Sequence, residues 1–98
     1  MFDINTINKR YFNIKIDNLT LDVEPPKIKV LKKITAIAKS KNEDAMDDLA
    51  IAIGMILSKN KSGYKVPEDV IDELDIDQMT EILTKFFEWL SNVKKDPN

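Results

Sequence analysis

The chain has 98 residues, of which 43% are apolar and 33% are charged, and its formal net charge is −2; this composition is typical of one small folded domain with a modest core. It contains neither histidine nor cysteine, so it cannot build a Ser-His-Asp or Cys-His catalytic arrangement, a disulfide, or the common His and Cys metal sites. No apolar run approaches the roughly 18 residues of a membrane span, and the first five residues lack the basic start and apolar core of a secretion signal, so we expect the protein to remain in the compartment where it is made.

Charge is distributed unevenly along the chain. Residues 1–41 carry nine Lys/Arg and four Asp/Glu, a balance of +5, whereas residues 42–98 carry six and thirteen, a balance of −7. The acidic second part argues against general nucleic-acid binding, while the basic first part keeps a small nucleic-acid-binding regulator as an alternative.

Residues 11–24 have the pattern of a β-hairpin. In both runs, 11–16 and 19–24, apolar and polar side chains alternate, which gives each strand one apolar face. Asp17-Asn18 lies between the runs and tolerates the positive φ angles of a tight turn. Residues 1–10 carry few such signals and are interpreted as an N-terminal arm.

Pro25-Pro26 ends the second strand and suits the start of a helix, which we predict from Lys27 to about Ser40. At 100° per residue, its apolar side chains fall within about half of the circumference: Ile28, Val30, Leu31, Ile34, Ile37 and Ala38. Lys29, Lys32 and Lys33 lie on the opposite face, which is either a solvated surface or a site for a phosphate or an acidic partner.

A second helix follows a capping box at Ser40 to Glu43, with Asn42 as an alternative cap, and ends near Ser58. Its first turn is acidic, and the helix dipole explains these carboxylates better than a metal site does: Glu43, Asp44, Asp47 and Asp48. From Leu49 onward the helix is apolar on nearly every side, with Ile51 and Met55 opposite the main face. It is therefore either the central core helix or a helix half covered by a partner subunit. Gly54, in mid-helix, predicts a closely packed neighbouring element.

The remaining sequence predicts two more helices. Gly63 supplies the left-handed residue that closes the second helix, and a short helix runs from about Val66 to about Leu74. Asp75 and Gln78 form a capping box, and the helix that they begin runs to about Val93.

The last helix has a wide apolar arc. Its core stripe repeats at helical spacing: Ile76, Met79, Ile82, Leu83, Phe86, Leu90 and Val93. Phe87 and Trp89 lie on opposite flanks of that stripe and are either interface residues or part of the core. Residues 94–98 form a polar, frayed tail.

Together these elements predict one domain over residues 1–98 with an α+β, mainly α fold: a β-hairpin at 11–24, followed by three to four helices within 27–93. A chain with two glycines offers no phosphate-binding loop. The acidic run 72–77 lacks the glycine and the terminal glutamate of a calcium loop. We therefore expect a protein-binding function without catalysis, metal or cofactor.

The order of these parts resembles the small tail assembly chaperones of long-tailed bacteriophages. The resemblance covers the hairpin with its Pro-Pro end, the basic amphipathic helix, the acidic-start apolar helix, and the last helix with its aromatic end. It implies binding to the tape measure protein, whose apolar surface many chaperone copies coat, and later displacement by tail tube protein. It also implies a location in the cytoplasm of the infected bacterium and absence from the mature virion. In this family a longer form often arises by ribosomal slippage near the end of the gene, where Lys94-Lys95 lies here.

Two sets of residues are candidates for these interactions. The candidates for partner contact are apolar side chains in excess of one small core: Ile51, Met55, Phe87 and Trp89. The candidates for electrostatic self-association are charges of the two unlike parts: Lys29, Lys32, Lys33, Asp44, Asp47 and Asp48. Head-to-tail packing of these parts predicts an open or ring-shaped homo-oligomer. The alternatives are a structural head–tail joining component of the virion and the nucleic-acid-binding regulator.

Overall fold

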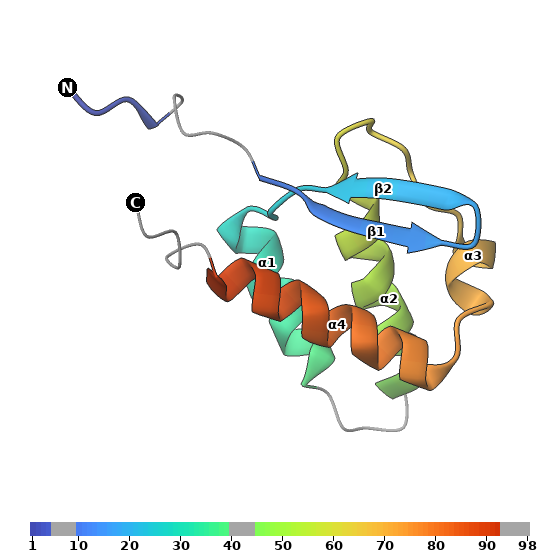
Figure 1. Ribbon diagram of the computed structural model, residues 1–98. Coiled ribbons are helices and arrows are strands. Elements are labelled where there is room, and N and C mark those ends of the chain that lie inside the picture. Colours follow the sequence, from blue (N-terminus) through green and yellow to red (C-terminus); the bar gives the residue numbers. More distant parts are fainter. Residues whose placement is uncertain (5–9, 40–44, 93–98) are drawn as a thin grey trace.

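The computed structural model describes residues 1–4, 10–39 and 45–92 (Figure 1). A two-stranded hairpin precedes four helices in these residues: β1 (Phe12–Ile16), β2 (Leu19–Val23), α1 (Ile28–Ala38), α2 (Ala45–Ser58), α3 (Glu68–Asp72) and α4 (Ile76–Ser91). The predicted class, α+β and mainly α with an N-terminal hairpin, is confirmed.

The hairpin is antiparallel and forms where the alternation predicted it. Phe12 pairs with Val23, and Ile16 pairs with Leu19 beside the turn. Asp17 adopts a φ of 53° in that turn, a left-handed conformation that Asp tolerates better than most residues do. Leu21 and Val23 are buried on the inner face of the hairpin, so the hairpin is stabilised by packing on the helices and does not stand alone.

The outer edge of β2 is covered by the loop that follows α2. Glu24 N–H donates to the Lys59 carbonyl at 2.8 Å, and Lys61 N–H donates to the Asp22 carbonyl at 2.9 Å. Within residues 10–39 and 45–92, β1 makes no such backbone bond to any segment except β2. Among these described residues, β1 therefore provides the edge of the sheet that has no backbone partner, here called its open edge.

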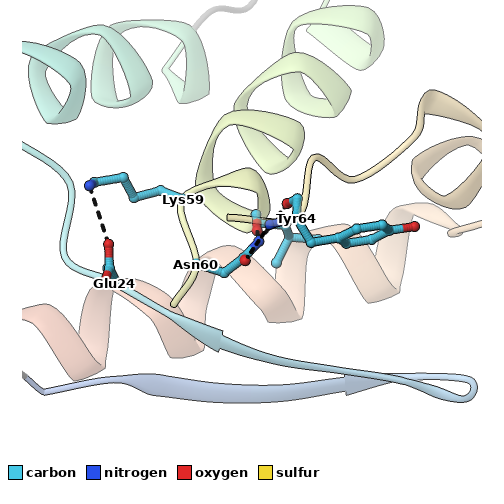
Figure 2. A network of polar contacts seen from close by, with 5 residues as sticks. Glu24, Lys59, Asn60 and Tyr64 are labelled. Atoms are coloured by element: carbon cyan, nitrogen blue, oxygen red, sulfur yellow. Dashed lines mark hydrogen bonds and ion pairs between the residues drawn. The ribbon is translucent and has the colours of Figure 1, made fainter. Parts of the chain in front are cut away.

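Asn60 holds this covering loop in place (Figure 2). Its side chain is buried, with 6% of the residue exposed, and its Nδ2 donates to the carbonyls of Leu57 and Tyr64 at 2.8 and 2.7 Å. Its Oδ1 accepts from Tyr64 N–H at 2.9 Å and from the Ser62 hydroxyl at 3.0 Å. All hydrogen-bonding groups of this amide are thus used, as a buried polar group requires.

The central helix of the fold is α2. It contacts α1, α3, α4 and β2, and Figure 1 shows it standing between α1 and α3. Its buried face carries Ala52, Ile53, Ile56 and Leu57. The predicted role as central core helix is confirmed for that face, whereas the opposite face stays accessible, with Ile51 53% exposed.

The ends of the helices largely follow their predicted signals. The capping box of α4 is present: Asp75 Oδ1 accepts from Gln78 N–H at 2.7 Å, and Gln78 Oε1 accepts from Asp75 N–H at 2.9 Å. Gly63 has the predicted left-handed conformation, with a φ of 71°, but α2 ends at Ser58. Gly63 lies in the following loop, where its N–H donates to the Asn60 carbonyl at 3.0 Å, so the prediction that it closes α2 is wrong. Some predicted features lie outside the described residues: the capping box at 40–43, Asp44, Val93 and the tail at 94–98.

Three expectations about residues in the helices are wrong. Ile28 and Ile76 are 65% and 43% exposed, although both were assigned to core faces. Each is the first residue of its helix and lies about 120° around the helix axis from the buried isoleucine six residues later. Gly54 does not mark a close neighbour, because a Cβ built there meets nothing within 4 Å.

Candidate functional site

Four aromatic rings join β1 to α4. Phe86 is fully buried at their centre, with its ring centroid 5.8 Å from those of Phe12 and Trp89 and 5.6 Å from that of Phe87. The Phe12 and Trp89 centroids are 5.7 Å apart. These separations lie in the favourable range for aromatic pairs, so the cluster fixes the position of α4 relative to the hairpin.

Arg10 closes the C-terminal end of this cluster. Its Nη1 donates to the Trp89 carbonyl at 2.7 Å, and its Nη2 donates to the Leu90 carbonyl at 3.0 Å. The guanidinium carbon also lies 4.3 Å from the Trp89 ring centroid, which is within cation–π range. The side chain therefore binds two carbonyls of the last turn of α4, of which that of Trp89 also accepts from Asn92 N–H, and it places a positive charge at the negative end of the helix dipole.

A first groove, here called the strand groove, lies between β1 on one side and α3 and α4 on the other. Its volume is about 560 Å³. The apolar part of its lining comes from all three elements: Phe12, Ile14, Ile16, Val70, Leu74 and Ile82. Charges of both signs line it as well: Lys15, Lys85, Asp17, Glu73 and Glu81. The groove thus combines an apolar floor, the open edge of β1 and a nearly neutral rim.

A second groove, here called the helix groove, lies between α2 and α3 and has a volume of about 570 Å³. Its apolar floor is formed on the outward face of α2 and on the segment around α3: Ala50, Ile51, Gly54, Met55, Val66 and Ile71. Three carboxylates and one amine line it: Asp47, Glu68, Asp72 and Lys65. Three negative charges against one positive charge give this lining a balance of −2.

The four residues predicted to contact a partner do not share one surface. Ile51 and Met55 line the helix groove. Phe87 and Trp89 are half-buried in the aromatic cluster. Trp89 does not line the strand groove, but its ring contacts that of Phe12, which does. The prediction that these four side chains bind a partner stays a prediction, now divided between two places.

The charged residues predicted for self-association lie at separate places in the structure. Lys29, Lys32 and Lys33 are all exposed on α1. Asp47 lies in the lining of the helix groove, whereas Asp48 is half-buried beside it in the sequence and outside that lining. Asp44 lies outside the described residues.

Neither groove was predictable from the sequence patterns. The period-two pattern placed Phe12, Ile14 and Ile16 on one face, but it could not show that the β1 edge stays open. Val70 and Leu74 were read only as parts of a short helix, although both line the strand groove. No local signal in residues 12–16 or 66–74 indicates that these two segments border one groove.

Two further surveys bear on the kind of site. Over residues 1–4, 10–39 and 45–92, no group of three or more carboxylates converges as around a metal ion. In the same part of the chain, no helix is both long and apolar enough to cross a membrane. Comparisons of the chain with protein families, with curated proteins and with solved structures found no match.

Proposed function

We propose that the protein is a non-catalytic phage tail assembly chaperone. In this role it coats the tape measure protein, keeps it soluble and helps to recruit tail tube protein, in the cytoplasm of the infected bacterial host, and it is absent from the mature virion. The observation that supports this proposal best is the strand groove, an open apolar surface on a small folded domain. The resemblance of the sequence to this chaperone family supplies the identity of the client.

The lining of the strand groove suits a client that offers many different apolar segments. Lys15 and Lys85 stand against Asp17, Glu73 and Glu81, so the rim has a balance of −1 and favours no strongly charged sequence. The apolar floor binds by removing apolar surface area from water, and this contribution depends little on which apolar side chains the client offers. Such a surface is suited to a long chain with repeated apolar stripes.

The size of the groove favours weak and reversible binding by each copy. Burial of one Leu- or Phe-sized client side chain contributes about 2 kcal/mol, so three of them contribute about 6 kcal/mol. Loss of translational and rotational freedom on association costs about 4 kcal/mol or more. One copy therefore holds its client weakly, which is what displacement by tail tube protein requires.

Co-expression with the tape measure protein tests the proposal. The client is expected in the soluble fraction only when this protein is present. Val70→Lys places a charge in the strand groove at a half-buried position and is expected to return most of the client to the insoluble fraction. Met46→Lys is the matched control, because Met46 is 55% exposed and lines neither groove.

The same experiment can overturn the proposal. A tape measure protein that is equally soluble alone, or with a folded Val70→Lys variant, contradicts it. Circular dichroism and thermal unfolding establish that each variant is folded. Mass spectrometry of purified particles adds a second test, since detection of this protein there would instead identify a structural head–tail joining component.

One observation favours a second candidate, the nucleic-acid-binding regulator. Lys29, Lys32 and Lys33 are exposed together on α1 and could contact a phosphate backbone. If they do, filter binding of duplex DNA should weaken steeply with salt, and Lys32→Glu should reduce both the affinity and the salt slope. Absence of a salt-dependent signal would remove this candidate.

A further inference from the structure

The outer face of α1 combines positive charge with an exposed apolar side chain. Ile28 is 65% exposed, and Lys32 and Ala36 follow it at spacings of four residues on the same exposed face. Lys29 and Lys33 flank this row and are exposed as well. The lysine stems can lie along apolar surface while their ammonium groups reach outward, so this face is both basic and able to cover apolar atoms.

The helix groove has the complementary character. Its floor carries Ile51, 53% exposed, and Gly54, where the absence of a side chain leaves open space within 4 Å. Asp47 and Asp72 stand on its two helical walls, α2 and α3. A helix laid in this groove could bring its backbone close to Gly54 while its flanking cations met the carboxylates.

These opposite charges are not used within one molecule. Across residues 10–39 and 45–92, none of the three α1 lysines forms an ion pair. The same holds for the three carboxylates of the helix groove: Asp47, Glu68 and Asp72. Neither surface therefore has its charges neutralised by an ion pair within the described residues, so an external partner of the opposite sign would meet no intramolecular competitor.

We infer that α1 of one copy docks through its outer basic face into the helix groove of a second copy. Ile28 and Ala36 lie on the apolar floor together with the stem of Lys32, which is in the same row, and Lys29 and Lys33 approach the acidic walls. α1 and α3 flank α2 on opposite sides (Figure 1), so one copy offers both surfaces at once. The contact is head to tail, and repetition of it yields open chains or closed rings. The inference does not depend on the identity of any client.

Charge and apolar burial contribute differently to this contact. Exposed ion pairs are worth about 0–1 kcal/mol each and are screened at high ionic strength, so they set orientation and rate more than affinity. Burial of the exposed Ile28 and Ile51 side chains supplies the part that salt does not remove. We therefore expect association to weaken with salt without disappearing abruptly.

Sedimentation velocity of the full chain over a concentration series is the first measurement. At low ionic strength, the average mass should rise with concentration, and it should rise less at about 1 M salt, where the Debye length falls to about 3 Å. Two folded variants should stay monomeric where the wild type associates: Lys29→Glu/Lys32→Glu on α1 and Asp47→Lys/Asp72→Lys in the groove. The control Lys15→Glu/Lys61→Glu changes the net charge as the α1 variant does, but it lies on neither surface and should associate like the wild type.

Mixing the two variants gives the decisive result. The groove variant keeps a native α1, and the α1 variant keeps a native groove, so an equimolar mixture should form a complex that neither forms alone. Gly54→Leu fills the groove without a charge change and should also weaken association, by about tenfold or more.

Three results would overturn the inference. A wild-type chain that stays monomeric at high concentration and low salt lacks the contact. If either charge-reversal variant associates like the wild type, the contact between copies is formed by other surfaces. If folded Gly54→Leu associates normally but no longer keeps the client soluble, the groove holds the client and not a second copy.

Discussion

The two grooves have nearly the same volume, about 560 and 570 Å³, yet their walls differ. The strand groove has a backbone edge on one side and helices on the other, with charges that nearly cancel. The helix groove lies between α2 and α3, and its charges are mainly negative. Because both floors are apolar, volume and hydrophobicity alone do not distinguish them. The charges and backbone groups of the walls are what distinguish the two grooves.

The two grooves differ because they arise from different elements, the hairpin and α2. One edge of the sheet is closed by the loop that Asn60 holds, and the other edge opens onto the strand groove. The helix groove instead arises because α2 is apolar on nearly all sides while the core covers only one of its faces. The strand groove thus arises because one edge of the sheet is open, and the helix groove arises because α2 carries more apolar surface than the core covers.

The largest expected effect is that of Asn60→Ala. This change removes two donated and two accepted hydrogen bonds. It deprives the buried Leu57 carbonyl and the part-buried backbone groups of Tyr64 of this partner, which should lower the free energy of unfolding by about 3 kcal/mol. Urea unfolding followed by circular dichroism measures the loss. The loop over β2 should open as well, so amide hydrogen exchange of Lys61 should accelerate.

Asn60→Asp provides the control for that prediction. The carboxylate still accepts from Tyr64 N–H, but it cannot donate to the carbonyls of Leu57 and Tyr64. It should therefore also destabilise the fold. Equal stability of wild type and both variants would mean that the loop closes the β2 edge without the Asn60 amide.

The second effect in size is that of Arg10→Ala. Two hydrogen bonds from a charged donor to carbonyls near the end of α4 are lost, together with the contact on the Trp89 ring. We expect a loss of about 2 kcal/mol in unfolding free energy. Trp89 fluorescence should report a more solvated ring.

Arg10→Lys keeps the charge but not the two-pronged geometry of the guanidinium. It should recover part of the stability and little of the native Trp89 emission. Recovery of both by lysine would show that charge at the end of α4 is sufficient.

Much of the fold was predictable because it depends on local signals. The alternation of β1 and β2, the turn at Asp17 and the capping box of Asp75 and Gln78 are all decided within a few residues of sequence. Helix periodicity succeeded at the centre of each apolar face. It failed at Ile28 and Ile76, because at the edge of an arc small differences in docking angle decide between burial and exposure.

The grooves were not predictable from local signals, since each is formed by segments that are distant in sequence. Val70 lines the strand groove because α3 and β1 border the same groove, which no pattern around residue 70 reveals. Gly54 shows the same limitation. A mid-helix glycine is compatible with a tight contact inside the monomer and equally with an open space on its surface. Only the structure distinguishes these two interpretations.

Gly54→Ala is the smallest of these effects and the one that sharpens the comparison most. Alanine is favoured over glycine in a helix by about 1 kcal/mol, and its Cβ meets nothing within 4 Å, so the monomer should gain about that amount and its melting temperature should rise by about 4–8 °C. If the helix groove serves only as surface, this gain is the entire effect. If it receives α1 of a second copy, the added methyl group lies where that helix approaches, and self-association should weaken while the monomer becomes more stable. Differential scanning calorimetry and sedimentation on the same samples measure the two quantities separately, and opposite signs would show that Gly54 serves the contact between copies at the expense of the stability of α2.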